Sequence, residues 1–302
     1  MGSFVSDNFP LVSVAIITYN QKEFLKDCID SVLAQDYPNF EIVIADDGST
    51  DGTPELLNTY SKEHAGIFVL KLSSVNQGIT ANSNAAHFSC SGKYIAWMGG
   101  DDVMLPGKLA KQVDFMEANP YCTICYHDLD VFESASNKTM YIQSRRVKPR
   151  EGELREYIKY GVFNGACASM VRADKTPTNG FNDLLPVASD WCYWVDSLAR
   201  GGQIRYIPEI LGRYRRHENN ITNQESRIRQ NSLDHLNTCN YILARYPEYF
   251  NEAMFCYAKN IRSLRHRLPY FKALIFSLKV SLDFRSIVAI SVFLITLGKV
   301  RL

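Results

Sequence analysis

Two adjacent carboxylates, Asp101 and Asp102, follow the apolar run "KYIAWM" and the glycine pair Gly99 and Gly100. Neighbouring acids repel each other and glycines weaken a strand, so folding alone gives little reason for this arrangement. Carboxylate oxygens are the ligands that Mg²⁺ and Mn²⁺ prefer in proteins. The segment therefore indicates a binding function at the point where the apolar run ends.

Polar side chains also follow two earlier apolar runs. Thr18, Tyr19 and Asn20 come after "VSVAII", and Asp46 and Asp47 come after "FEIVIA". We expect buried strands at 12–17, 40–45, 67–72 and 93–98. They alternate with helical patterns, which predicts an α/β fold with a mostly parallel sheet flanked by helices. Ligands of such sheets bind beyond the carboxyl ends of the strands, so the three polar clusters are expected to meet there.

Helix start signals separate these strands. Apolar residues from Phe24 to Leu33 recur at helical spacing, and Asn20 is a candidate cap for that helix. Ser49 or Asp51 can cap the next helix, which Pro54 opens.

Composition is that of a folded globular protein. The 302 residues include 33 basic and 32 acidic side chains, for a net charge of +1. No general positive field attracts nucleic acid, so we expect no nucleic-acid partner and a local site for any anionic ligand.

The eight cysteines are scattered, and the first residues lack the layout of a secretion signal. Reduced thiols and a cytoplasmic location are the expectation. Cys122 and Cys125 resemble half of a zinc site, but no second pair has suitable spacing, and the alternation in "YCTICYHDLDVF" favours buried strand residues.

From about residue 224 the pattern is mostly helical. The apolar stretch 286–298 is shorter than the ~20 residues of a membrane span. Lys272, Lys279 and Arg285 flank apolar side chains, which suits either a helix at a membrane surface or one packed on the core.

Five segments together resemble family 2 glycosyltransferases, which have the GT-A fold. They are the amino-terminal stretch through "ADDGSTDGT", then "NQGITANSNAA", "GKYIAWMGGDDVMLPGKL", "ASDWCYW" and "YRRHENNIT". The resemblance covers roughly residues 10 to 222. It implies a nucleotide-sugar-binding half at 1–118 and an acceptor and catalytic half at 119–222. Residues 223–302 lie outside the resemblance, and their helical pattern predicts a C-terminal appendage.

The resemblance implies transfer of a sugar from a nucleotide-sugar donor to an acceptor hydroxyl, with inversion. Asp47 resembles the aspartate that pairs with the nucleobase, and such a pairing favours a UDP-linked donor. Thr18, Tyr19 and Asn20 fall where relatives surround the base and ribose. Further donor contacts are implied at four positions, which are Gly78, Gly100, Asp102 and Arg215, with Arg216 as the alternative to Arg215. Purely structural roles are equally possible for Asp102, for Gly78 and for the two arginines.

The resemblance also implies a Mn²⁺ or Mg²⁺ ion, which would neutralise the departing diphosphate. Asp101 is the expected metal ligand, and His217 is expected at the metal or the diphosphate. The sequence departs from the pattern at Gly99, where many relatives have an acid. His217 is a natural replacement for that missing ligand.

Asp190 falls where relatives carry the base that takes the proton from the acceptor hydroxyl. The preceding position, often Glu in relatives, is Ser189. A lipid-linked saccharide acceptor in O-antigen or capsule synthesis, at the inner face of the cell membrane, is the expectation. A soluble or protein acceptor and a non-catalytic sugar-nucleotide-binding module remain as alternatives.

Overall fold

The computed structural model of the chain describes residues 9–218, 220, 225–261, 270–281, 284–296 and 298–300. Within them, one sheet contains nine strands in the order β3-β2-β1-β4-β8-β6-β9-β5, with β7 paired to β6. The strands are β1 (Val12–Thr18), β2 (Phe40–Asp46), β3 (Phe68–Leu72), β4 (Tyr94–Gly99), β5 (Val103–Met104), β6 (Cys122–Glu133), β7 (Thr139–Ile142), β8 (Ser169–Arg172) and β9 (Gln203–Arg216). The helices are α1 (Lys22–Leu33), α2 (Thr53–Glu63), α3 (Ile79–His87), α4 (Lys108–Ala118), α5 (Leu154–Tyr160), α6 (Ser189–Ala199), α7 (Glu225–Arg245), α8 (Phe250–Asn260), α9 (Tyr270–Ser281) and α10 (Phe284–Ile295).

The first four strands form the parallel half of the sheet. β1 lies between β2 and β4, and β3 pairs with β2. All residues of β1 except Ile17 are buried, because helices cover both faces of a parallel sheet. The four strands predicted from the apolar runs are confirmed, and no strand end moves by more than one residue.

The second half of the sheet is mixed, and it returns the chain to the acidic pair. β8 is antiparallel to both β4 and β6, whereas β6 and β9 run parallel. β5, which begins directly after Asp102, is antiparallel to β9 and pairs Val103 with Arg213. This pairing places the end of β9 beside the end of β4.

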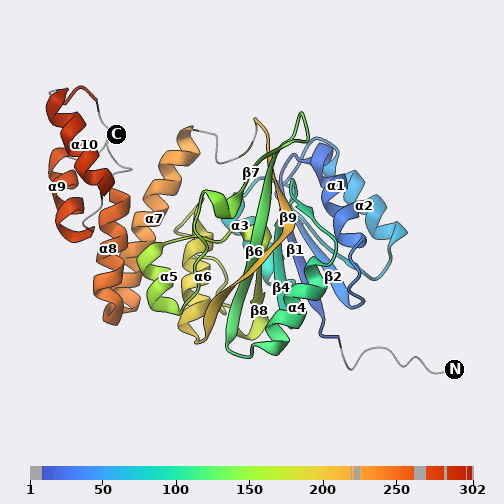
Figure 1. Ribbon diagram of the computed structural model, residues 1–302. Helices are drawn as coiled ribbons and strands as arrows, with labels where there is room; N and C mark the ends of the chain where they lie inside the picture. The colour runs from blue at the N-terminus through green and yellow to red at the C-terminus, as the bar shows by residue number, and fades with distance from the viewer. Residues whose placement is uncertain are drawn as a thin grey trace.

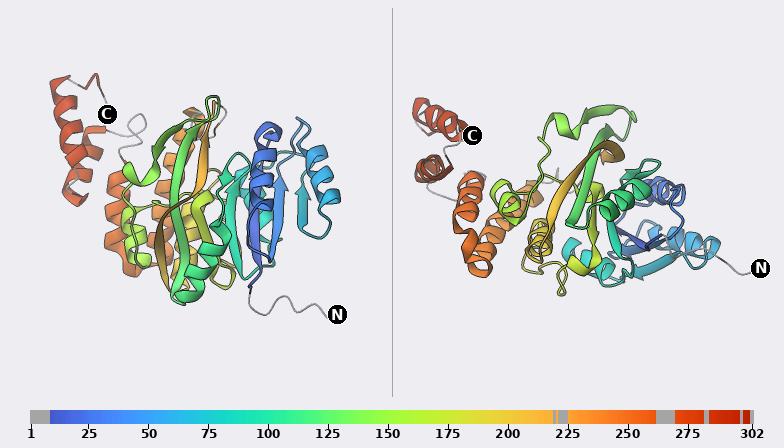
Figure 2. Two further views of the ribbon diagram at one scale, coloured as in Figure 1. Left: turned by 45° about the vertical axis from the view of Figure 1, so that its right-hand side comes forward. Right: turned by 60° about the horizontal axis from the view of Figure 1, so that its bottom comes forward.

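The C-terminal helices α7 and α8 are packed onto the domain. Figures 1 and 2 show α5 and α6 between the sheet and these two helices. Cys239 and Ile242 of α7 and Ala253 and Cys256 of α8 belong to the main hydrophobic core. These two helices and the sheet therefore share one core.

Helices α9 and α10 form a small cluster of their own at the edge of the molecule (Figure 1). Tyr270, Leu274 and Ala289 are its buried apolar residues, and the hydroxyls of Ser277 and Ser286 lie 2.8 Å apart. None of the helices in the described ranges combines the length and hydropathy that a membrane crossing needs.

The structure tests the predicted cap residues of α1 and α2. Asn20 does not cap α1, because Gln21 is the N-cap residue. Asn20 instead has a φ of 50°, and its Oδ1 accepts a hydrogen bond from the Thr50 N–H at 2.8 Å, which joins the ends of β1 and β2. At α2 the N-cap is Gly52, and the carboxylate of Asp51 accepts a hydrogen bond from the Thr53 N–H at 3.0 Å.

The prediction that Cys122 and Cys125 are buried strand residues is confirmed. Cys122 and Cys125 are buried in β6, and all eight thiols are free.

Candidate functional site

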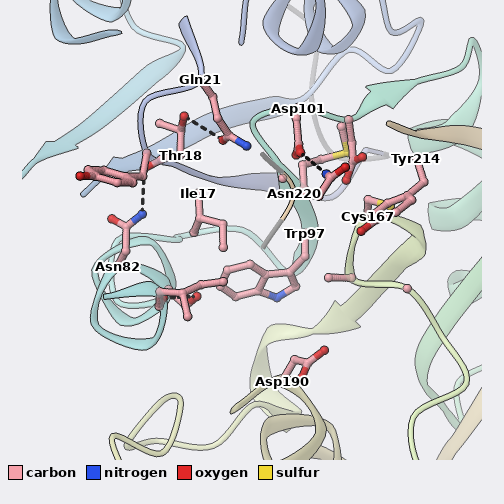
Figure 3. Close-up of a pocket in the computed structure, with 18 of the residues that line it drawn as sticks. Ile17, Thr18, Gln21, Asn82, Trp97, Asp101, Cys167, Asp190, Tyr214 and Asn220 are labelled. Carbon is pink, nitrogen blue, oxygen red and sulfur yellow. Dashed lines mark hydrogen bonds between the residues drawn. The ribbon is translucent and has the colours of Figure 1, made fainter. Parts of the chain in front are cut away.

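A cavity of about 1470 Å³ opens beyond the carboxyl ends of β1, β2 and β4 (Figure 3). Typical small-molecule pockets measure about 300–1,000 Å³, so this one has room for more than one small substrate. Its lining includes nine of the residues predicted from the sequence, which are Thr18, Tyr19, Asn20, Asp47, Gly78, Asp101, Asp102, Asp190 and His217. Gly100 and Arg215 do not line the cavity.

One wall of the cavity carries a carboxylate and an imidazole in contact. His217 Nε2 lies 2.9 Å from Asp101 Oδ2, and the Asn220 amide donates to the same oxygen at 3.2 Å. The backbone N–H of His217 donates to Asn220 Oδ1 at 2.6 Å. The ring of Phe24 packs against the imidazole with centroids 4.5 Å apart. These contacts hold two candidate metal ligands side by side.

Arg215 fixes the loop that carries the acidic pair. Its Nε donates to the Asp101 carbonyl at 2.7 Å, and its backbone N–H donates to Asp102 Oδ1 at 3.1 Å. Its guanidinium also pairs with Asp27 at 3.0 Å and is only slightly exposed. The predicted phosphate contact of Arg215 stays a prediction, and these donors are already engaged within the chain.

The two glycines are required by close approach. A Cβ on Gly99 would lie 2.7 Å from Asp101 Oδ1, closer than real Cβ contacts come. A Cβ on Gly100 would lie 2.8 Å from Gln21 Oε1 and 2.9 Å from Thr18 Oγ1. Gly99 therefore leaves space for the Asp101 carboxylate, and Gly100 lets the end of β4 approach the loop after β1.

Asp102 and Lys108 are buried close to this loop. Burial, together with the neighbouring Asp101 charge, raises the pKa of Asp102 well above its ordinary value. Burial lowers the pKa of Lys108 to about 8, although the Asp102 charge partly opposes that shift. Lys108 Nζ donates to the Cys167 carbonyl at 2.7 Å. A buried cation thus offsets part of the negative charge beneath the site.

Asp47 orders the loop that precedes α3. Its two carboxylate oxygens accept hydrogen bonds from the backbone N–H groups of Gln77 at 2.7 Å and Gly78 at 2.9 Å. Gly78 has a φ of 95°, a conformation that glycine adopts at little cost. A carboxylate has about four lone-pair sites, so Asp47 keeps acceptor capacity toward the cavity.

The loop after β1 is tied to its neighbours. Thr18 Oγ1 donates to Gln21 Oε1 at 3.1 Å, and the Asn82 amide donates to the Thr18 and Ala45 carbonyls at 3.3 and 2.9 Å. Tyr19 is 47% exposed, so its ring is free to contact a ligand in the cavity.

Asp190 lies in the first turn of α6, on the other side of the cavity from Asp101. Figure 3 shows the two carboxylates with the Trp97 indole between them. Burial raises the pKa of Asp190, while the His235 charge and the Trp191 N–H oppose that rise. Trp191 and Trp194 are buried in the core, and Trp194 also lines the cavity. The geometry therefore places the Asp101–His217 pair on one wall of the cavity and the Asp190 carboxylate on another.

The sequence profile of glycosyl transferase family 2 matches residues 13–175, more than half of the 302-residue chain.

The chain belongs to glycosyl transferase family 2.

Two relatives illustrate the match. An uncharacterized protein of Mycobacterium tuberculosis is 31% identical over 217 residues, which cover 70% of this chain and 60% of that protein. The Escherichia coli protein WfaP, described as a UDP-Glc:alpha-D-GlcNAc-diphosphoundecaprenol beta-1,3-glucosyltransferase, is 28% identical over 229 residues. That match covers 74% of this chain and 85% of WfaP. The chain thus spans about 60% of the length of its mycobacterial relatives.

The fold is shared with a solved structure of Staphylococcus aureus TarS in complex with UDP. The TM-score is 0.61 at 15% sequence identity, over 94% of this chain and 91% of that one. This likeness confirms the predicted α/β GT-A fold.

Several residues of this family 2 site were missed by sequence reasoning. Asn82 and Asn220 make the hydrogen bonds described above, and Trp97, Tyr214 and His235 line the cavity. Asn220 stands three residues after His217, which is a local signal that could have identified it. His235 lies on α7, outside the family match, and its sequence neighbours give no comparable signal.

The donor set of this site fits a divalent cation bound mainly through substrate. Within the described part of the chain, no three His, Cys, Asp or Glu side chains gather as a metal-binding group. Asp101 and His217 nevertheless supply one carboxylate and one imidazole, and Mg²⁺ commonly binds through one or two carboxylates plus substrate phosphates. A metal held here would take its other ligands from phosphate oxygens and water.

Proposed function

We propose that the protein is a metal-dependent, inverting glycosyltransferase that moves a sugar from a UDP-linked donor to an acceptor hydroxyl. The observation that carries the proposal is the convergence of Asp47, Asp101 and Asp190 on one cavity. Asp47 and Asp101 meet because β2 and β4 run parallel and end at one edge of the sheet, whereas Asp190 reaches the same cavity from α6.

The donor occupies the side of the cavity formed by the 1–118 half. Asp47 accepts a hydrogen bond from the nucleobase edge, which favours uracil. Thr18, Tyr19 and Asn20 surround the base and ribose, and Gly78 borders them. This division is supported by the ends of β1 and β2, which carry those residues.

The diphosphate lies beside Asp101 and His217, which would hold Mn²⁺ or Mg²⁺. The cation supplies charge neutralisation to the departing diphosphate. Asp102 is buried and accepts the backbone N–H of Arg215, so in this proposal it shapes the loop. Arg215 and Gly100 hold the same loop in place from behind.

Asp190 takes the proton from the acceptor hydroxyl as that oxygen attacks the anomeric carbon. A positioned base contributes about 10²–10⁴-fold to such a step. Direct inversion requires one base and no protein nucleophile, and Asp190 is the carboxylate proposed for that role. The 119–222 half supplies this acceptor side.

The acceptor is proposed to be a lipid-linked saccharide, as the description of WfaP states for that enzyme. Exposed apolar side chains on α10 support a membrane-facing role, and these are Phe284 (72% exposed), Ile287 (45%), Leu294 (55%) and Ile295 (81%). Lys272 and Lys279 of α9 are also exposed and would attract anionic headgroups. The enzyme would then act in the cytoplasm, at the inner face of the cell membrane, in O-antigen or capsule synthesis.

A binding screen tests the donor assignment. Thermal unfolding is followed with UDP-, GDP- and TDP-linked sugars, each with and without Mn²⁺. The proposal predicts a rise in Tm that is largest for a UDP-sugar and that requires the metal. Equal shifts with all three nucleotides, or shifts that do not depend on Mn²⁺, would contradict it.

Labelled sugar from the selected donor is then offered to GlcNAc-diphosphoundecaprenol, and a soluble saccharide serves as the competing acceptor.

A further inference from the structure

A basic segment of the chain borders the cavity in the half proposed to bind the acceptor. Residues 145–150 contain three arginines and one lysine, which are Arg145, Arg146, Lys148 and Arg150. The segment follows Tyr141 and Gln143, and both of these residues line the cavity. From there the chain runs from β7 to α5 (Figure 1). Four positive charges therefore lie next to the site in the chain.

Hydrogen bonds to β6 hold both ends of this segment. The hydroxyl and the backbone N–H of Ser144 donate to the Asp128 carboxylate, the N–H at 2.9 Å. At the other end, the Tyr126 hydroxyl accepts the Arg150 N–H and donates to the Arg150 carbonyl, each at 2.8 Å. The backbone of the segment is therefore fixed relative to the sheet, and these bonds do not use the basic side chains.

Two of the arginines stack on aromatic rings at the edge of the cavity. The guanidinium carbon of Arg146 lies 3.6 Å from the ring centroid of Tyr141, which lines the cavity. The guanidinium carbon of Arg150 lies 3.6 Å from the ring centroid of Tyr160, the last residue of α5. Val162, two residues after Tyr160, also lines the cavity. Stacking orients a guanidinium group and leaves its N–H groups available for an anion.

Acidic side chains do not neutralise this segment. None of its four basic residues forms an ion pair with another residue in the described part of the chain. The acids that follow it are engaged elsewhere, because Glu151 pairs with Arg205 at 3.2 Å and Glu153 and Glu156 form the capping box of α5. The segment therefore presents uncompensated positive charge that can hold an anionic group locally.

The row of cations continues from Arg150 to the C-terminal helices. Lys159 Nζ lies 5.7 Å from the ring centroid of Tyr160 and 5.5 Å from that of Phe255 on α8. Lys259 Nζ lies 5.1 Å from the same Phe255 centroid. Helix α8 packs in turn on α9. Basic side chains thus lead from the edge of the cavity toward the helices for which a membrane contact is proposed.

We propose that Arg146 and Arg150 bind the diphosphate of an acceptor whose saccharide is joined to its lipid through that group. The inference rests on the proposed function, in which the acceptor is a lipid-linked saccharide, and it adds the linking group and the residues that bind it. Guanidinium groups match phosphate oxygens in bidentate geometry. With the diphosphate bound here, the saccharide extends into the cavity toward Asp190, and the lipid extends along α5 and α8.

Binding of decyl diphosphate to the full chain tests the proposal. Isothermal titration is carried out without donor and in EDTA, so that no metal is present. Arg146→Gln/Arg150→Gln should weaken binding by about tenfold or more, because hydrogen bonds to a charged group are lost. Arg200→Gln/Arg245→Gln makes the same charge change at exposed positions outside the cavity lining and should bind like wild type. No binding by wild type, or equal affinity in wild type and Arg146→Gln/Arg150→Gln, would overturn the proposal.

Three comparisons identify the group that is bound. Decyl glucoside has the same alkyl chain without phosphate, and wild-type binding as tight as that of decyl diphosphate would contradict a phosphate site. Phosphatidylglycerol vesicles should bind wild type and Arg146→Gln/Arg150→Gln equally, and loss of vesicle binding alone would assign the arginines to the membrane surface instead. Asp101→Asn should keep the wild-type affinity for decyl diphosphate, because a loss there would place this ligand at the proposed donor site.

A second variant keeps the proposal falsifiable if Arg146→Gln/Arg150→Gln does not fold, as judged by near-ultraviolet circular dichroism. Lys148 is exposed and lies between the two arginines in the chain, so Lys148→Glu reverses one charge and leaves both stacked rings in place. It should weaken decyl diphosphate binding by about fivefold or more, and unchanged affinity would refute the proposal. These measurements use no donor, so their failure is distinct from that of the proposed function, which fails if Asp190→Asn still transfers sugar at the wild-type rate.

Discussion

His217 Nε2 lies 2.9 Å from Asp101 Oδ2, although 116 positions separate the two residues in the chain. The contact depends on the pairing of β5 with β9, which places the end of β9 beside the end of β4. Asn220 donates to the same Asp101 oxygen and accepts the His217 N–H. Two groups able to bind a divalent cation are therefore held side by side by hydrogen bonds within the chain.

Substitution of either member of this pair should remove metal-dependent donor binding. Asp101→Asn and His217→Gln are each expected to weaken Mn²⁺-dependent binding of a UDP-sugar by about tenfold or more. Loss of a residue that only supports a metal ligand lowers metal affinity by about 10–100-fold, so loss of a ligand should cost at least as much. Isothermal titration with and without Mn²⁺ measures the effect. Asp36→Asn, an exposed acid outside the cavity lining, is the control and should bind like wild type. Wild-type affinity in Asp101→Asn would disprove the assignment.

Gly99→Ala should harm the same metal-dependent binding with little effect on folding. The added Cβ would lie 2.7 Å from Asp101 Oδ1, so the carboxylate must turn away from His217 and Asn220. The comparison is Gly66→Ala, which meets open space but has a φ of 90°. Gly66→Ala should lower Tm through backbone strain and leave donor binding intact. If the two variants lose binding equally, the contact with Asp101 is not the cause.

Lys108 should make stability increase with pH in alkaline solution. Its folded pKa is about 8, below the ordinary lysine pKa of 10.5, so the unfolded chain binds more protons between these values. Stability rises with pH wherever the unfolded state holds more protons. The free energy of unfolding of wild type, minus that of Lys108→Met, should therefore grow as pH rises from about 8 toward 10.5. Urea unfolding of both proteins measures this difference in the free energy of unfolding. A difference that stays flat or falls with pH would contradict the lowered pKa of Lys108.

The proposed membrane contact predicts binding to vesicles that contain anionic lipid. Each basic side chain near such a surface contributes about 1 kcal/mol, so Lys272→Glu/Lys279→Glu should weaken vesicle binding by about tenfold or more. Lys71→Glu/Lys138→Glu makes the same charge change at exposed positions on β3 and next to β7, and should have no such effect. Cosedimentation with the vesicles measures both. Equal loss in the two variants would indicate nonspecific attraction.

Local patterns in the sequence were sufficient for the ends of the first four strands and for the polar residues that follow three of them at the cavity. The runs before Thr18, Asp46 and Asp101 are continuous and apolar, and their polar ends meet because parallel strands end at one edge. Asn20 was misassigned as a cap because a cap residue and a residue that bridges two loops look alike in sequence.

Residues whose roles depend on long-range packing could not be predicted in the same way. Arg215 belongs to a basic run that resembles a solvated turn, yet it is buried between the rings of Phe24 and Phe132. His235 reaches the cavity only because α7 packs on α6. Neither position could be recognised from a periodicity or a residue spacing in a single sequence.

Burial of Asp190 predicts that activity is lost on acidification at a higher pH than an ordinary aspartate would give, because only the ionised form accepts a proton.

The central claim is tested most directly by measuring donor affinity and sugar transfer in Asp190→Asn. With the donor chosen by the binding screen, the account predicts wild-type affinity in the presence of Mn²⁺ and a transfer rate reduced by about 10²-fold or more. Transfer at the wild-type rate in Asp190→Asn would contradict it.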